Sequence, residues 1–284
     1  MGENVKVANT TLNCRGILMD ISKPVVMGII NVTSDSFFKG SRVDDDTMLA
    51  LAEKHLCDGA TMLDIGVMSS RPGAKEMPAE EEEQKLKSTV SQLKSTFPKA
   101  ILSVDTYRAD VAKAALEAGA HIVNDIGGGR FDTEMMKVVG QYRAPYILMH
   151  NRAKSAVMTQ HTSYDDLLFE INQYFFEQEW KARQAGIIDV ILDPGIGFSK
   201  TPDQNFIIIN RLDELDLVGR PLLIGLSRKS FIYKTLNVDS DDALNGSTAM
   251  HMAALERGAR ILRVHDVKEA MQCVQLFNKM TASK

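Results

Sequence analysis

Short apolar segments recur eight times along the chain, and stretches with helical periodicity lie between them. The apolar segments cover residues 25–30, 61–65, 101–104, 121–123, 145–149, 188–192, 221–226 and 260–264. They are continuous rather than alternating, which is typical of strands buried on both faces in a parallel sheet. Eight strand–helix pairs predict an α/β fold of one kind, the (β/α)8 TIM barrel.

The intervening segments carry helix signals. Leu86, Val90 and Leu93 fall on one face of a helix. Residues 201–204 combine an N-cap threonine, a proline in the first turn and a glutamine that can complete a capping box. Similar polar pairs predict two more helix starts, Ser163 with Asp166 and Asp266 with Glu269. Four glutamates at 80–83 are expected to form a solvated helix face.

A doubly wound open sheet is the alternative fold. It would more often place a GxGxxG turn after the first strand, where this chain has Asn31-Val32-Thr33-Ser34. Residues 5–21 alternate loosely and predict a short N-terminal β-hairpin before the barrel. Because no linker-like or low-complexity tract interrupts the sequence, residues 1–284 are expected to form a single domain.

Charge and cysteine content exclude several classes of function. The net charge of −4 gives no general attraction for nucleic acid or an anionic membrane, so neither is expected as a partner. The three cysteines lie far apart without CxxC spacing, which argues against a disulfide framework or a cysteine zinc site. No apolar run approaches the roughly 20 residues that span a bilayer. A cytoplasmic location is therefore expected.

Polar side chains follow every predicted strand, at the end where a TIM barrel carries its chemistry. In chain order these are Asn31, Ser70, Arg71, Asp105, Asn124, Asp125, His150, Asp193, Lys229, Arg263 and His265. A lone aspartate before a helix is more often an N-cap than a catalyst, and His150 is expected to be a hydrogen-bonded core histidine. The convergence of all these strand ends on one cavity nevertheless indicates a binding site.

The mixture of charges predicts a ligand with two chemically different parts. Carboxylates such as Asp105 and Asp193 suit a heterocycle rich in N–H donors, since one carboxylate matches an amine next to a ring N–H. Arginine, lysine and histidine suit an anion such as a diphosphate. Asn31 offers a neutral oxygen that could hold Mg²⁺ weakly, with the diphosphate supplying other ligands.

Eight segments together resemble the dihydropteroate synthase family of pterin-binding barrels. They are residues 26–37, 62–73, 103–106, 123–126, 148–150, 192–198, 225–230 and 263–267, in the family's order. The resemblance implies condensation of 6-hydroxymethyl-7,8-dihydropterin diphosphate with 4-aminobenzoate, which gives 7,8-dihydropteroate and diphosphate in folate biosynthesis. It also implies Mg²⁺ as cofactor and a homodimer through the C-terminal helices, where Leu244, Met250, Met252 and Ala253 add apolar surface.

The resemblance also implies residue roles. The pterin pocket would contain Asp105, Asn124, Asp193 and Lys229, with Ile126, Met149 and Phe198 packed around the ring. The diphosphate would be held by Asn31, which would lie near Mg²⁺, and by Arg263 and His265. The aminobenzoate site would contain Phe37, Ser70, Arg71, Pro72 and Ser230. Residues with a catalytic role would be Asp105, Lys229, Arg263 and His265.

The chain departs from the family pattern at a few positions. Ser34 replaces the usual proline, Val67-Met68 replaces Gly-Glu, Ser70 replaces threonine, and the loop 151–160 differs from the common form. Two alternatives therefore remain, a methyltetrahydrofolate–corrinoid methyltransferase-like barrel and a catalytically inactive barrel subunit. A methyltransferase of this kind has no diphosphate to bind, so the predicted anion-binding residues Arg71, Arg263 and His265 argue against it. Val67-Met68 is the best support for the inactive subunit.

Overall fold

The computed structural model describes residues 10–32, 43–68, 76–154, 157–215 and 219–283. Within them, eight parallel strands close into a barrel in the order β10-β3-β4-β5-β6-β7-β8-β9. The strands are β3 (Val25–Asn31), β4 (Met62–Gly66), β5 (Ile101–Asp105), β6 (Ile122–Asp125), β7 (Tyr146–Met149), β8 (Val190–Asp193), β9 (Leu222–Ile224) and β10 (Ala259–Val264). The predicted α/β barrel is confirmed.

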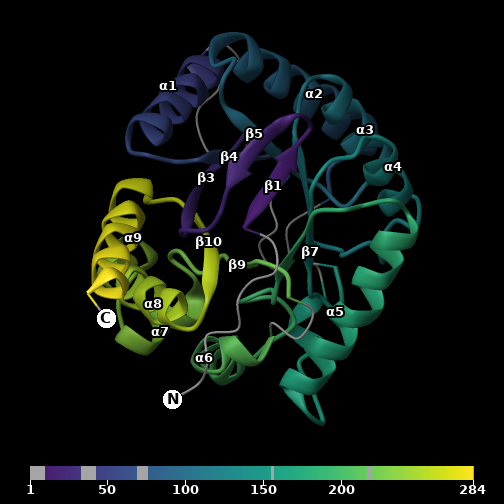
Figure 1. Cartoon of the computed structure of the whole chain (residues 1–284). Helices are drawn as coiled ribbons and strands as arrows, with labels where there is room; N and C mark the ends of the chain where they lie inside the picture. Colours follow the sequence, from purple (N-terminus) through teal and green to yellow (C-terminus); the bar gives the residue numbers. More distant parts are fainter. Residues whose placement is uncertain (1–9, 33–42, 69–75, 155–156, 216–218, 284) are drawn as a thin grey trace.

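Helices alternate with the strands and surround them (Figure 1). They are α1 (Val43–Cys57), α2 (Ala79–Thr96), α3 (Ala109–Glu117), α4 (Met135–Gln141), α5 (Leu167–Gln184), α6 (Pro202–Asn210), α7 (Ser230–Leu236), α8 (Leu244–Glu256) and α9 (Val267–Ala282), with 3₁₀ turns η1 (Met158–Gln160), η2 (Leu212–Leu215) and η3 (Ser240–Ala243). The outward faces of the strands and the inward faces of the helices form the main core. Leu86, Val90 and Leu93 belong to it, as their spacing predicts.

The barrel interior is stacked in layers. One apolar residue from each strand forms the lower layer, namely Met27, Met62, Ile101, Ile122, Ile147, Ile191, Leu223 and Ile261. Because side chains alternate along a strand, the residues two positions further point into the same interior, nearer the carboxyl ends. That next layer contains Asp64, Asn124, Asp193 and Arg263. The barrel is therefore apolar below and charged towards its mouth.

A β-hairpin precedes the barrel, as predicted from residues 5–21, of which residues 5–9 lie outside the described part. Strands β1 (Thr11–Cys14) and β2 (Ile17–Asp20) pair antiparallel, and Arg15 and Gly16 adopt left-handed conformations in the turn. Leu12, Cys14 and Met19 of the hairpin pack in the same cluster as the lower interior layer. In Figure 1 the hairpin lies across the strands. It therefore closes the amino-terminal end of the barrel.

One predicted helix start, at Ser163, needs correction, and a second, at Asp266, is in the predicted place but lacks a side-chain cap. The helix cap at α5 is Asp166 rather than Ser163, since the Asp166 carboxylate accepts a hydrogen bond of 3.1 Å from Phe169 N. Asp266 occupies the N-cap of α9, but its carboxylate pairs with Arg228 and does not bond the helix amides. The capping box of α6 is confirmed, with both reciprocal hydrogen bonds between Thr201 and Gln204 present.

The expectation of a solvated glutamate face on α2 was wrong for one of its four members. Glu82 is fully buried, whereas its neighbours are half-buried or exposed. The Glu82 carboxylate accepts a hydrogen bond of 2.7 Å from Thr106 Oγ1 and forms an ion pair with Arg108. A buried carboxylate is tolerated when both its oxygens are paired in this way.

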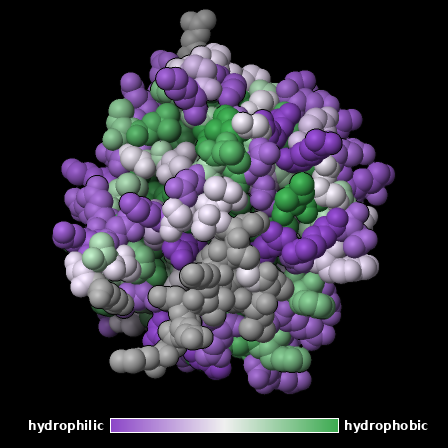
Figure 2. Space-filling model, viewed as in Figure 1, coloured by the Kyte–Doolittle hydropathy of each residue, from purple (hydrophilic) through white to green (hydrophobic). Residues whose placement is uncertain are grey.

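Among the described residues, none of the helices has the length and apolar character to cross a membrane. Figure 2 shows hydrophilic side chains over much of the periphery of one face, with hydrophobic side chains gathered in a few separate patches.

Candidate active site

Two ion pairs of Arg263 connect three strands near the barrel mouth. Arg263 of β10 donates from Nε to Asp64 of β4 at 2.6 Å and from Nη2 to Asp105 of β5 at 2.8 Å. Asn124 of β6 donates from Nδ2 to the same Asp64 oxygen at 2.9 Å. The second oxygen of Asp64 and the Asn124 amide oxygen are buried and accept no hydrogen bond from the described residues. Two buried acceptors are therefore left for a ligand.

Asp105 lies in an environment that disfavours its charge. Burial raises the pKa of Asp105 to about 7, while the adjacent Arg263 guanidinium opposes that change and the Asp64 charge adds to it. A carboxyl group with this pKa changes its protonation close to neutral pH. Perturbed carboxyl groups of this kind gather at functional sites.

Asp193 lies at the end of β8, nearly fully buried. Its Oδ1 accepts a hydrogen bond of 2.7 Å from Gly195 N, which fixes the carboxylate against the loop that follows. Burial raises the pKa of Asp193, and the positive charge of Lys229 opposes that rise. The carboxylate therefore has one oxygen committed to the loop.

Lys229 follows β9 and occupies the N-cap position of α7. Its ammonium donates a hydrogen bond to Ile196 O and lies 4.7 Å from the centre of the Phe198 ring. Burial lowers the pKa of Lys229 to about 8, and Asp193 counteracts this effect. The lysine thus links α7 to the loop that follows β8, beside the Asp193 carboxylate.

An apolar cluster lies beside these charged groups. Tyr107, Ile126 and Met149 form its buried part, and Phe198 packs against it. Met68, one of the positions that depart from the family pattern, packs there too, whereas Val67 is buried in the main core. The three residues predicted to surround a ring, Ile126, Met149 and Phe198, are therefore brought together with Met68.

Other predicted residues lie at the rim of the barrel. Asn31 ends β3 with an exposed side chain, and Ser230, the first residue of α7, is also exposed. His265 follows β10 and is exposed as well, yet the surrounding protein and the Arg263 charge lower the pKa of His265 to about 4. The imidazole is therefore neutral at pH 7. Phe37, Ser70, Arg71 and Pro72 lie outside the described residues.

The prediction for His150 is confirmed, since its side chain is buried and its Nδ1 lies 3.0 Å from Lys200 Nζ. Two buried charged residues were missed. Asp64 could have been suspected, because an aspartate inside an apolar strand is rarely buried without a partner. Lys200 carries no comparable signal, since it stands between a glycine-rich loop and a helix.

The oxygen donors near the barrel rim are few. No group of three or more His, Cys, Asp or Glu side chains suited to a metal occurs in the described part of the chain. A side chain at Gly66 would lie 3.5 Å from Asn31 Oδ1 and 3.6 Å from Asp105 Cβ, so these residues border one space. That arrangement fits a cation held by a single amide oxygen, with its other ligands supplied by a bound anion and water.

Comparison with known proteins agrees with this geometry. The family model described as "Pterin binding enzyme" matches residues 27–265. A dihydropteroate synthase of Synechocystis is 43% identical over 259 residues, which are 90% of this chain and 89% of that protein. The solved dihydropteroate synthase of Yersinia pestis, in complex with a sulfonamide drug, superposes with a TM-score of 0.90 at 37% identity and covers 96% of this chain and 99% of the other.

A second solved structure, the Xanthomonas albilineans enzyme with 4-aminobenzoic acid, has a TM-score of 0.90 at 34% identity, over 97% of this chain and 99% of the other. The fold and the matched segments define a barrel of the pterin-binding enzyme family, to which this chain belongs. Within that family it belongs to the dihydropteroate synthases, which are transferases of folate biosynthesis. This membership decides against the methyltransferase-like and inactive alternatives.

Proposed function

We propose that the barrel mouth binds 6-hydroxymethyl-7,8-dihydropterin diphosphate with its pterin ring inside and its diphosphate towards the rim. The observation that carries the proposal is the set of buried acceptors on Asp64, Asn124 and Asp193 beside the apolar cluster. A pterin offers an amine and ring N–H groups to such acceptors, and its flat ring matches the apolar wall. Ile126, Met149 and Phe198 supply that wall.

The reaction is substitution at the methylene carbon next to the ring. The bond between this carbon and the diphosphate oxygen breaks, the amine nitrogen of 4-aminobenzoate forms the new bond, and the nitrogen loses a proton to solvent. Asp105 and Asp193 stabilise positive charge that develops on the pterin. Arg263 and His265 donate hydrogen bonds to the departing diphosphate, whose negative charge grows in the transition state.

Mg²⁺ would be held by Asn31 together with the diphosphate, and when bound it would neutralise part of the charge on the leaving group. Phe37, Ser70, Arg71, Pro72 and Ser230 are proposed for the 4-aminobenzoate site. Ser230 has support from its position one residue after Lys229, at the start of α7.

A homodimer is proposed through α6 and α8. An apolar groove of about 420 Å³ lies there, and Phe206, Ile207, Met250 and Ala253 line it. Leu244 and Met252 are further apolar residues of α8. Apolar grooves of this kind mark surfaces where proteins associate, and a two-fold dimer is the commonest assembly.

The chain is further proposed to be one pterin-binding domain over residues 1–284 and to work in the cytoplasm. The three free cysteines, all within the described residues, support a reducing compartment. Neither nucleic acid nor a membrane is proposed as a partner, which the net charge of −4 supports.

The experiment that tests the proposed function is diphosphate release with the dihydropterin diphosphate as substrate. Release should depend on added 4-aminobenzoate and on Mg²⁺, and 7,8-dihydropteroate should form in equal amount. Release that is independent of 4-aminobenzoate would contradict the proposed reaction. An Asn31→Ala variant should need more Mg²⁺ for half-maximal release, if this amide oxygen binds the ion.

A further inference from the structure

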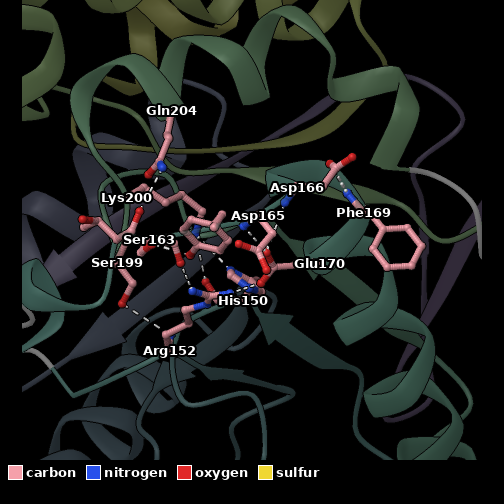
Figure 3. A network of polar contacts seen from close by, with 12 residues as sticks. His150, Arg152, Ser163, Asp165, Asp166, Phe169, Glu170, Ser199, Lys200 and Gln204 are labelled. Atoms are coloured by element: carbon pink, nitrogen blue, oxygen red, sulfur yellow. Dashed lines mark hydrogen bonds and ion pairs between the residues drawn. The ribbon is translucent and has the colours of Figure 1, made fainter.

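Lys200 is a buried lysine at the end of the loop that connects β8 to α6. Its Nζ lies 3.0 Å from His150 Nδ1 and 3.0 Å from Phe198 O. It also lies 3.2 Å from Gly195 O and 3.4 Å from His150 O. Figure 3 shows Lys200 and His150 within one network of polar contacts. Its side chain therefore crosslinks the end of β7 to two positions of the loop.

The four partners of the Lys200 amine are three carbonyl oxygens and the His150 Nδ1 atom, and no carboxylate of the described residues bonds it directly. A buried ammonium without a carboxylate partner is costly. Burial lowers the pKa of Lys200 to about 7, and the Asp193 charge opposes this effect. Lys229 and Arg152 add repulsion. What the lysine contributes, and an apolar residue cannot, is hydrogen bonds to three backbone carbonyl groups.

The loop held by Lys200 carries the groups assigned to the pterin. Gly195 N donates to Asp193 Oδ1 at 2.7 Å, while Gly195 O accepts from Lys200. Ile196 O accepts from Lys229, whose ammonium lies beside the Phe198 ring. Lys200 therefore binds the peptide groups of Gly195 and Phe198. Gly195 also orients Asp193, and its neighbour Ile196 binds Lys229.

The backbone of the loop 194–199 adopts the left-handed region at several residues and is held by contacts with other elements. Gly195, Gly197 and Ser199 have φ values of 68°, 81° and 48°, all in the left-handed region. A Cβ at Gly195 would lie only 2.1 Å from His150 O, so the loop packs directly on the end of β7. Asn205 of α6 holds the middle of the loop by accepting from Gly197 N at 2.7 Å. Lys200 holds both ends.

We propose that Lys200 is a positioning residue, which fixes the loop 194–199 so that Asp193 and Phe198 face the pterin. The inference rests on the proposed pterin site and names a residue outside it. We expect no contact between Lys200 itself and the substrate. It acts through the carbonyl groups of Gly195 and Phe198.

The test compares Lys200→Met with Val90→Ala, a control that removes buried methyl groups from the core on α2, far from the loop. Calorimetry gives the Kd for phosphate-free 6-hydroxymethyl-7,8-dihydropterin, steady-state kinetics give the Michaelis constant for aminobenzoate, and calorimetric scans give the Tm. Lys200→Met should raise the pterin Kd by about tenfold, equivalent to roughly 1.4 kcal/mol, and leave the Michaelis constant for aminobenzoate within about twofold. Val90→Ala should lower the Tm and leave both constants unchanged.

A wild-type pterin Kd in folded Lys200→Met overturns the inference, and so does an equal rise in Val90→Ala. Lys200→Gln keeps a polar side chain, so it should raise the pterin Kd less than Lys200→Met does. It replaces the methionine variant in the test if that variant does not fold. Asp193→Asn separates the two proposals. If it weakens pterin binding while Lys200→Met does not, only the role of Lys200 is wrong. If Asp193→Asn binds pterin like the wild type, the pterin site itself is wrong, and the role of Lys200 fails with it.

Discussion

Arg263 donates a hydrogen bond of 2.6 Å to the carboxylate of Asp64, whose side chain is fully buried. The pair joins the two neighbours of β3 in the barrel, β10 and β4. The Asp64 carboxylate also accepts a hydrogen bond from Asn124 Nδ2. One buried carboxylate therefore orients both the Arg263 guanidinium and the Asn124 amide. The site therefore depends on a residue that is expected to lie beneath the ligand.

Asp64→Asn should destabilise the protein, because it removes the charge that balances buried Arg263. The free energy of unfolding should fall by about 3 kcal/mol, the lower end for breaking a buried ion pair, since Asp105 remains as a partner. Urea denaturation measures this loss. Glu134→Gln, in an exposed pair with Lys137, is the control and should change stability by less than about 0.5 kcal/mol. Equal losses in both variants would contradict the role of Asp64.

His265→Ala should separate turnover from binding. A donor that acts mainly on the departing diphosphate should lower the single-turnover rate by roughly 10²–10³, with the Kd for phosphate-free pterin unchanged. Arg263→Ala should lower both the rate and the affinity, because Asp64 and Asp105 lose the cation between them. If His265→Ala weakened the binding of phosphate-free pterin as strongly as Arg263→Ala, the proposed division of roles would be wrong.

The pH dependence of kcat/KM for the pterin substrate should be bell-shaped. Asp105, with a pKa of about 7, loses its proton as pH rises, so the rate should increase through that range. Lys229, with a pKa of about 8, loses its positive charge above that pH, so the rate should then decrease. Lys229→Arg should be slower but should lack the alkaline decrease, because arginine stays charged. An alkaline limb that persists in Lys229→Arg would assign it to another group.

Ile207→Asp should convert the proposed dimer into a monomer. Ile207 is 42% exposed and lines the groove between α6 and α8, where a buried carboxylate without a partner would oppose association. Light scattering at micromolar concentration measures the mass. Phe169→Asp on α5 is a matched control, since Phe169 is also exposed but lies outside the groove. A wild-type protein that is monomeric under these conditions would refute the proposed dimer.

The strand order of the barrel was predictable because each strand is a continuous apolar run, and connections between parallel strands leave few arrangements. Hydrogen bonding to distant partners was harder to predict. Glu82 of α2 can be buried because Thr106 and Arg108, which follow β5, bind its carboxylate. Asp266 looks like an ordinary helix cap until Arg228 is seen beside it.

The candidate site was predictable where a residue lies at a strand end, as with Asp105, Asn124 and Asp193. The residues that orient these side chains were missed. Asp64 contacts Asn124 across 60 positions of sequence, and Lys200 reaches His150 across 50. Pairings of this range are fixed by the closure of the barrel and leave no local pattern.

The hairpin at the amino-terminal end has a consequence for the order of events. Because β1 and β2 pack against the lower layer of the described barrel, we expect substrates to enter and leave the proposed site through the opposite end. With the pterin bound deepest, aminobenzoate that arrives first occupies the passage that the pterin must use. With the pterin site proposed above, we expect binding to be sequential and ordered, and we expect a high concentration of aminobenzoate to slow the entry of the pterin. The hairpin at the amino-terminal end is therefore expected to determine the order in which the two substrates bind.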